Sequence, residues 1–221
     1  MFISDCGLSA IVLQAYNALT MARQALLLID VQNDFCPGGA LPVPRGDEVV
    51  LVLNRYLELF VQAHLPIFAS RDWHPTKTRH FAAYGGTWPA HCVQGTHGAA
   101  FHPGLKLPDG VTILSKGMDP DEESYSCFQG IASDGRSFLD VLNREQVQEL
   151  FVGGLATDYC VKATVLDACT HQFVVNVLSD AIRGVELKPG DTEQALRELE
   201  RAGARFVTFE EVAPRLGVRL H

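Results

Sequence analysis

Short, continuously apolar runs alternate along this chain with longer segments whose apolar residues recur at helical spacing. Ala25–Asp30 (ALLLID) is the first apolar run, and Gly46–His64 is the first segment with helical spacing. A short run without polar alternation is typical of a strand buried on both faces of a parallel sheet. Strands that alternate with helices predict right-handed βαβ units. We therefore expect an α/β fold, with a doubly wound, mainly parallel sheet and helices on both faces in a Rossmann-like three-layer αβα arrangement.

The same alternation continues to the C-terminus. Further strands are predicted at Pro66–Arg71, Val111–Ser115, Gln148–Gly153, Phe173–Leu178 and Arg205–Phe209. Further helices are predicted at Ser137–Gln146, Asp158–His171 and Thr192–Ala202. The stretch Asp72–Gly110 breaks the alternation and is rich in Gly, Pro, His and Trp. Loops of that length inside a compact domain are usually functional.

Residues 1–24 differ from the rest of the chain. Their apolar character is interrupted too often for a membrane span, Asp5 lies among them, and the basic start of a signal peptide is lacking. Met21 stands just before the first strand. We interpret residues 1–24 as an N-terminal extension outside the core and residues 25–221 as one domain. The alternative is an additional helix that packs on this domain.

Composition and charge limit the classes of partner. The 221 residues are 47% hydrophobic, which is enough for a sizeable core, and the formal net charge is −8. A net negative charge disfavours nucleic acid, and no segment is apolar enough for a membrane span, so neither nucleic acid nor a membrane is an expected partner. A homo-oligomer stays open. The six cysteines form no CxxC pair, which favours reduced thiols and a cytoplasmic location; they are Cys6, Cys36, Cys92, Cys127, Cys160 and Cys169.

Reactive and metal-binding residue types stand at the ends of four predicted strands. Asp30 ends the first strand, Asp72 and His74 follow the second, Lys116 follows the third, and Leu155–Cys160 follows the fourth. In a doubly wound sheet, ligands bind beyond the carboxyl ends of the strands. We therefore expect these side chains to share one rim of the sheet.

Asp72, His74, His80 and His91 form the first group of candidate site residues. They occur as RDWHPTKTRH and WPAHC within the long loop. A carboxylate and several imidazoles close in sequence predict a site for a divalent metal of intermediate softness. The alternative for any single histidine is a solvated side chain that binds nothing. Three histidines and an aspartate within twenty residues favour the metal site.

Asp30, Lys116 and Cys160 form the second group. Cys160 opens the predicted helix Asp158–His171, where unpaired N–H groups and the helix dipole are expected to lower the pKa of the thiol. Those N–H groups are also suited to holding an oxyanion. Asp30 is suited to accept the thiol proton, and Lys116 to stabilise the charges. The alternatives are a buried apolar cysteine, a solvated lysine and an aspartate that caps a turn.

Five motifs, in this order along the chain, resemble the nicotinamidase/pyrazinamidase branch of the isochorismatase-like hydrolases. They are IDVQNDFCPGG (Ile29–Gly39), RDWHP with His80, WPAHCVQGT (Trp88–Thr96), SKG (Ser115–Gly117) and GLATDYCV (Gly154–Val161), and SYSCF (Ser124–Phe128) is also similar to that branch. The resemblance covers the chain from about Ala25 to the last strand. It implies the isochorismatase-like fold for residues 25–221.

The resemblance also assigns roles to the candidate residues. It implies a catalytic triad of Asp30, Lys116 and Cys160. It implies one divalent metal ion, zinc, iron or manganese, held by Asp72, His74 and His91, with His80 as a fourth histidine seen in part of the family. It further implies a cis peptide between Leu155 and Ala156, and oxyanion donors in the N–H groups of Ala156 and Cys160.

The activity implied is hydrolysis of nicotinamide to nicotinate and ammonia in NAD salvage, through a cysteine thioester, with pyrazinamide as a further substrate. Phe35, Trp88, Tyr125 and Leu155 are the expected substrate contacts, and the metal is expected to bind the pyridine nitrogen. Tyr159 stands where several relatives have His. The alternatives are another amidohydrolase or vinyl-ether hydrolase of the superfamily, and a metal-binding or redox protein without hydrolase activity.

Overall fold

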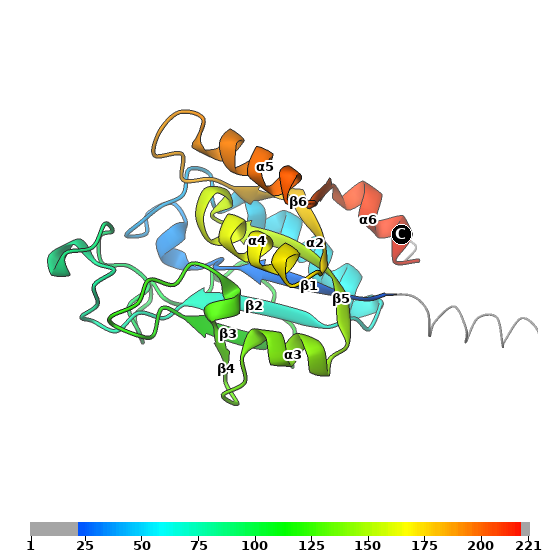
Figure 1. Cartoon of the computed structure of the whole chain (residues 1–221), viewed down its shortest axis with the longest axis horizontal. Coiled ribbons are helices and arrows are strands. Elements are labelled where there is room, and N and C mark those ends of the chain that lie inside the picture. The colour runs from blue at the N-terminus through cyan, green and yellow to red at the C-terminus, as the bar shows by residue number, and fades with distance from the viewer. Residues whose placement is uncertain (1–21, 218–221) are drawn as a thin grey trace, which may run out of the picture.

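A seven-stranded sheet forms the centre of the molecule (Figure 1). The computed structural model describes residues 22–217. The strand order is β4-β3-β2-β1-β5-β6-β7, and every neighbouring pair is parallel except β3 and β4. The strands are β1 (Arg23–Ile29), β2 (Ile67–Asp72), β3 (Thr112–Lys116), β4 (Ile131–Ala132), β5 (Val147–Leu155), β6 (Val174–Arg183) and β7 (Arg205–Val207). The predicted fold class is confirmed.

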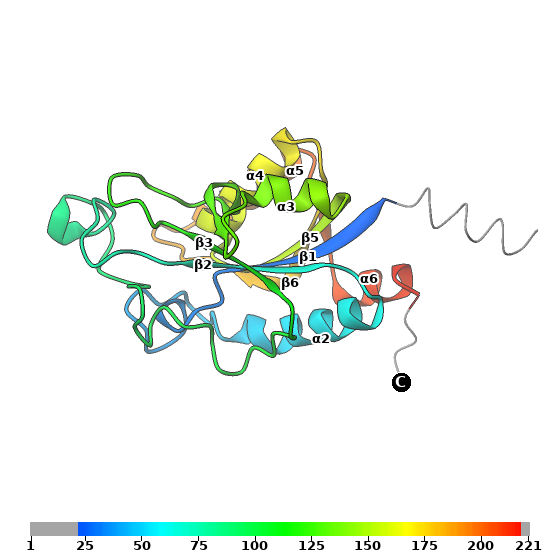
Figure 2. The same cartoon turned by 90° about the horizontal axis from the view of Figure 1, so that it is seen from below.

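Helices cover both faces of this sheet (Figure 2). Helices α2 (Glu48–Gln62) and α6 (Phe209–Arg215) lie on one face. Helices α3 (Phe138–Arg144), α4 (Lys162–Thr170) and α5 (Asp191–Arg201) lie on the other. Successive side chains of β1 enter opposite cores, as the alternation of a strand requires: Leu26 and Leu28 face α2, whereas Leu27 and Ile29 face α3 and α4. Burial on both faces explains why this strand is continuously apolar.

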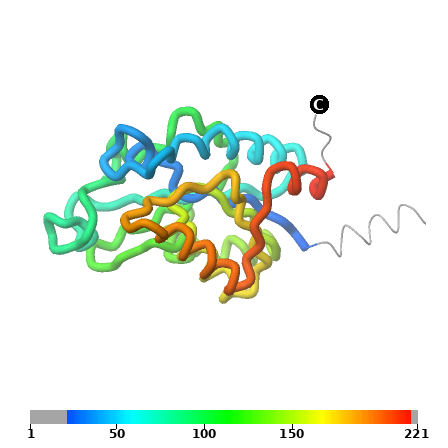
Figure 3. The backbone as a smooth tube through the Cα atoms, turned by 90° about the horizontal axis from the view of Figure 1, so that it is seen from above, coloured from blue at the N-terminus to red at the C-terminus, as the bar shows by residue number. Residues whose placement is uncertain are grey.

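The order of the strands places a crevice at the end of β1. From β1 the chain goes first to β2 and β3 on one side, and it then crosses back to β5 on the other side of β1. Such a reversal opens a ligand site beyond the carboxyl ends of the two central strands. The long connection from β2 to β3 lies at this end of the molecule, opposite the N-terminal end of β1 (Figure 3).

The structure contains elements that the sequence pattern does not predict. Strand β4 has only two residues, and the seven-residue helix α6 contains Pro214, a residue that disfavours a helix interior. Strand β6 runs five residues past the predicted end at Leu178, because its pairing with β5 resumes at Ile182 after a bulge that contains the polar Ser179 and Asp180.

The predicted N-terminal extension lies largely outside the described residues. Its last two positions, Arg23 and Gln24, belong to β1 and pair with β5. Within residues 22–217, no helix is long and apolar enough to cross a membrane.

Candidate active site and metal centre

Two residues with positive φ, Asp30 and Gly154, bring the backbone at the ends of β1 and β5 close together. Asp30, the first residue after β1, adopts a left-handed conformation with φ of 50°. Gly154 in β5 has φ of 123°, and a Cβ at this position would lie 2.1 Å from the carbonyl oxygen of Ile29. Only glycine permits this approach. The aspartate after β1 therefore faces the turn that follows β5.

That turn carries Cys160. Strand β5 ends at Leu155, the Leu155–Ala156 peptide is cis, and Thr157–Val161 forms one turn of π-helix before α4 begins. The cis peptide was expected, and so was a helical start for the cysteine. The carbonyl of Ala156 accepts hydrogen bonds from the N–H groups of Tyr159 and Val161 at 3.1 Å each. Cys160 is 7% exposed.

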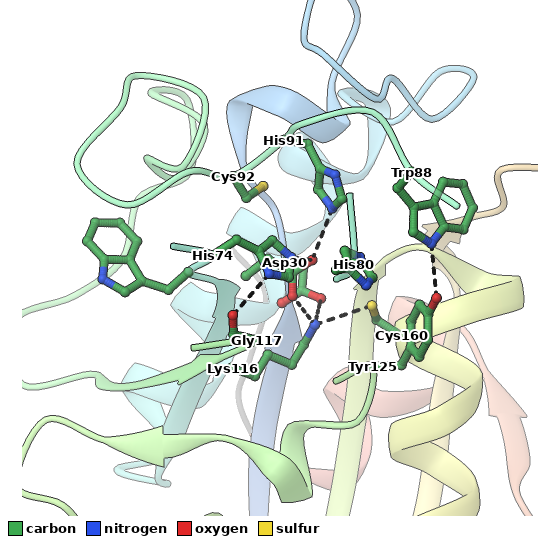
Figure 4. A network of polar contacts seen from close by, with 12 residues as sticks. Asp30, His74, His80, Trp88, His91, Cys92, Lys116, Gly117, Tyr125 and Cys160 are labelled. Atoms are coloured by element: carbon green, nitrogen blue, oxygen red, sulfur yellow. Dashed lines mark hydrogen bonds and ion pairs between the residues drawn. The ribbon is translucent and has the colours of Figure 1, made fainter. Parts of the chain in front are cut away.

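Lys116 joins the predicted catalytic residues (Figure 4). Its Nζ lies 2.9 Å from Asp30 Oδ2 and 3.3 Å from Cys160 Sγ, and it also forms an ion pair with Asp72. The hydroxyl of Ser70 donates a 2.7 Å hydrogen bond to Asp30 Oδ1. The three residues of the predicted triad, far apart in the sequence, are thus assembled around one ammonium group.

The direction of the pKa shift of Cys160 is opposite to the prediction. Burial raises the pKa of the Cys160 thiol well above its ordinary value, and the Lys116 ammonium opposes this effect only in part. Burial also raises the pKa of Asp30, although Lys116 and Ser70 act against it. The helix start was expected to lower the pKa of the thiol, but enclosure within the site outweighs it. The raised pKa favours the thiol form of Cys160 at rest.

Lys116 and Asp72 are charged in the buried site. Burial alone would lower the pKa of Lys116, but Asp30 and Asp72 raise it well above its ordinary value. Burial alone would raise the pKa of Asp72, but Lys116 and the histidines keep it well below its ordinary value. A buried charge persists only when it is paired. Here each partner stabilises the charged form of the other.

The three predicted histidine ligands converge beside Asp72. His74, His80 and His91 are buried and each can place one ring nitrogen within 4.8 Å of the others. Nδ1 of His74 lies 3.0 Å from the carbonyl oxygen of Gly117, and Nδ1 of His91 lies 2.8 Å from that of Pro89. Because each Nδ1–H group donates to a carbonyl oxygen, the Nε2 atom of each ring can offer a lone pair to a metal ion.

The unpaired ring nitrogens indicate a metal centre. His74 Nε2 and His91 Nε2 lie 3.6 Å and 3.8 Å from Asp72 Oδ2. Among the side chains of residues 22–217, His74 Nε2 and His80 Nδ1 are buried and have no hydrogen-bond partner. Burial, with the neighbouring His74 and His91, lowers the pKa of His80 to about 4, so its ring is neutral at physiological pH. Neutral imidazoles and a carboxylate are a suitable ligand set for a divalent metal such as zinc.

Four supporting residues were not recognised from the sequence. The side chain of Gln32 donates to the carbonyl of Asp72 and accepts from its N–H group, both at 2.8 Å. Asp34 Oδ2 accepts a 2.7 Å hydrogen bond from the N–H group of Cys92, the residue after His91. Ser70 orients Asp30, as described above. Gly117 has φ of 68°, and a Cβ there would lie 2.4 Å from the His74 ring. Gln32 and Asp34 lie in the loop just after β1, and this position at a strand end could have identified them as site residues.

A pocket opens over these groups and is lined mainly by aromatic side chains. Trp88 Nε1 donates a 2.9 Å hydrogen bond to the hydroxyl of Tyr125, and the Trp88 ring packs edge-on against Tyr159 with centroids 4.9 Å apart. Phe35 lines the pocket beside His91. The side chain of Leu155 is fully buried in the core that packs against α2, rather than on the pocket lining. Three of the four expected contacts therefore face the pocket.

Sequence comparison identifies a family domain and a relative that both match most of this chain. The isochorismatase domain model matches residues 24–211. Nicotinamidase of Escherichia coli strain K12 is 41% identical over 207 residues, covering 86% of this chain and 97% of that protein.

Solved structures agree with this comparison. The pyrazinamidase of Pyrococcus horikoshii, in complex with zinc, superposes with a TM-score of 0.78 and 43% identity, covering 85% of this chain and 99% of that chain. An L. infantum protein in complex with nicotinate has a TM-score of 0.74 and 32% identity, covering 86% of this chain and 94% of that chain. The domain match includes all seven strands, except for Arg23 at the start of β1, and the candidate active site, and the chain therefore belongs to the isochorismatase family.

Proposed function

We propose that this chain is a nicotinamidase that hydrolyses nicotinamide to nicotinate and ammonia in NAD salvage, and that it also accepts pyrazinamide. The observation that carries the proposal is one pocket in which Cys160, paired with Lys116 and Asp30, lies beside a cluster of three buried histidines. The relatives support it, because a nicotinamidase and a pyrazinamidase are both more than 40% identical to this chain.

The histidine cluster and Asp72 are proposed to hold one divalent metal, most simply zinc. The fit rests on buried ring nitrogens that lack a protein partner and on the neutral His80 ring. Zinc in the P. horikoshii relative supports the choice of metal. When bound, the metal would supply a Lewis acid that binds the pyridine nitrogen and orients the ring. Phe35, Trp88 and Tyr125 would enclose the ring.

The first half of the reaction uses the thiol. Asp30 accepts the proton of Cys160 as the sulfur attacks the carboxamide carbon, so that the thiolate forms only when substrate is present. Lys116 stabilises the negative charge that the proton transfer leaves on sulfur. The N–H groups of Ala156 and Cys160 hold the oxyanion of the tetrahedral intermediate. Asp30 then returns its proton to the leaving nitrogen, and the C–N bond breaks. Ammonia departs, and the acyl group remains bound to Cys160 as a thioester.

The second half of the reaction restores the enzyme. Asp30, again a carboxylate, takes a proton from a water molecule as the water oxygen attacks the thioester carbon. The same N–H groups hold the second oxyanion. The C–S bond breaks, and the proton on Asp30 returns to the sulfur of Cys160. The second proton of the water leaves with the carboxyl group and passes to solvent, so the product is nicotinate. The raised pKa of Asp30 suits a group that alternates between base and acid.

Ammonia release from nicotinamide tests the proposal. We expect turnover that chelation abolishes and a divalent metal restores. His74→Ala is expected to fold but to lose the stoichiometric metal that elemental analysis finds in the parent protein. Metal-loaded protein that releases no ammonia from nicotinamide or pyrazinamide would contradict the proposed activity. Full metal content in His74→Ala would contradict the proposed ligand set.

A further inference from the structure

The carboxylate of Asp158 links two segments that both contribute to the wall of the pocket. Asp158 lies two residues before Cys160 in the π-helical turn and is 6% exposed. Its Oδ1 accepts a 2.9 Å hydrogen bond from the N–H group of Val185, and its Oδ2 accepts a 2.8 Å bond from that of Glu186. Val185 lines the pocket together with Cys160 and Tyr159. One buried side chain thus ties the turn of the nucleophile to a distant wall residue.

The segment that carries Val185 depends on this link for its conformation. Strand β6 ends at Arg183, so the sheet no longer holds the chain at Val185. Glu186 adopts a left-handed conformation with φ of 56°, which a non-glycine residue keeps only where its surroundings hold it. The Glu186 carboxylate accepts hydrogen bonds from the N–H groups of Gly190 and Thr192, at the start of α5. The segment is therefore fixed at one end by Asp158 and at the other by α5.

We propose that Asp158 is a positioning residue that holds Val185 against the pocket and thereby limits the size of the ring that the enzyme accepts. This inference rests on the proposed function. Both oxygens of Asp158 are engaged by backbone N–H groups, so the residue acts through Val185 and not on the reacting atoms. Hydrogen bonds to a buried carboxylate are stronger than neutral ones, and a lost acceptor leaves a buried donor unpaired.

Asp158→Asn tests the link with the smallest change of shape. The carboxamide has one acceptor oxygen, so its NH2 group has to face one of the two backbone N–H groups. We expect the ratio of kcat/KM for nicotinamide over quinoline-3-carboxamide, which carries the same nitrogen and amide on a larger fused ring, to fall about tenfold or more. The change should come mainly from KM. Asp191→Asn is the matched control. Asp191, the first residue of α5, accepts a hydrogen bond from the N–H group of Lys188 and makes none to Val185 or Glu186, so the ratio should not change in this variant.

A double-mutant cycle shows whether Asp158 acts through Val185. Val185→Ala widens the pocket directly and should also lower the ratio. If Asp158 positions Val185, adding Asp158→Asn to Val185→Ala changes the ratio little further. Fully additive effects would overturn the proposal. An equal loss of kcat for both amides at an unchanged ratio would overturn it as well, because that result places Asp158 in catalysis rather than in selection of the ring.

Hydrogen exchange tests the link without any substrate. The amides of Val185 and Glu186 in the metal-loaded parent protein should exchange slowly, although Glu186 is exposed. Asp158→Asn should accelerate exchange there and leave β1 unchanged. Rapid exchange of both amides in the parent protein would overturn the proposal even if Asp158→Asn does not fold. Slow exchange in a protein that does not hydrolyse nicotinamide would contradict only the proposed function.

Discussion

At the scale of single residues, burial raises the pKa of every described cysteine, so the direction of the shift does not distinguish Cys160 from the others. Burial raises the pKa of Cys36 to about 11 and that of Cys127 to about 12, and it raises the pKa of Cys160 well above its ordinary value too. Only the setting distinguishes Cys160 among the described cysteines, because it lines the pocket with Lys116 Nζ 3.3 Å from its sulfur. In the proposed mechanism, the reactivity of this buried thiol depends on Asp30 as a base.

Cys160→Ser is expected to lose nearly all turnover of nicotinamide, because a hydroxyl is much harder to ionise than a thiol and Asp30 is a weak base. Metal content and nicotinamide binding should persist, since neither depends on the sulfur. The matched control is Cys169→Ser in α4, a partly exposed cysteine away from the pocket, which should keep parental kcat. Steady-state ammonia release and calorimetric binding measure these effects. Parental turnover in Cys160→Ser would rule out the covalent mechanism.

The site residues were largely predictable from the sequence, because strand ends and motifs identify them directly. Asp30, Lys116 and Cys160, and likewise Asp72 and the three histidines, meet as expected. The raised pKa of Cys160 was not predicted, since it depends on enclosure by residues distant in the sequence. Leu155 shows a second limit. Its place beside Ala156 indicates the site, but the alternation of β5 directs its side chain into the core.

At the scale of elements, the contact between β1 and β5 determines where the reacting groups lie. Gly154→Ala would place a methyl group against the backbone of Ile29, which cannot rotate away as a side chain can. We expect a loss of about 3 kcal/mol or more in unfolding free energy and a marked fall in kcat, because Asp30 and the turn of Cys160 are forced apart. Chemical denaturation and ammonia release measure the two effects.

Gly203→Ala is the matched control for this prediction. Gly203 also has a positive φ, of 96°, but its Cβ would meet nothing within 4 Å. It should therefore cost only the conformational penalty of about 1–2 kcal/mol and leave kcat unchanged. Equal stability losses in the two variants would show that the contact between β1 and β5 is not tight.

The elements that were predicted and those that were missed have a common physical explanation. Strands β1, β2 and β5 are buried between two layers of helices, so their sequences are apolar runs that stand out. Strand β4 is a two-residue edge strand, and helix α6 contains Pro214 near its end. Short elements at the margin of the fold are stabilised by tertiary contacts that leave little pattern in the sequence.

At the scale of the whole molecule, the start of the folding unit lies close to the first residues of β1. The family match begins at residue 24 and β1 begins at Arg23, two residues before the predicted boundary. Gln24 pairs with Glu149 in the sheet, and its side chain donates a 2.7 Å hydrogen bond to the Glu149 carboxylate. The proposed domain therefore needs the residues just before Ala25, whereas no described contact of the pocket involves them.

Two shortened chains test this boundary. A chain that begins at Met21 keeps all of β1 and should retain the melting temperature and the nicotinamide turnover of the full chain. A chain that begins at Leu26 lacks Arg23, Gln24 and the buried Ala25, and with them the first three pairs between β1 and β5. We expect its melting temperature to fall by at least about 4 °C, since 1 kcal/mol corresponds to roughly 2–4 °C in a domain of this size. Scanning calorimetry of the metal-loaded proteins measures the difference. Because both chains lack residues 1–20, a similar loss in both would place the N-terminal segment within the folding unit, whereas a loss confined to the shorter chain assigns the boundary to β1.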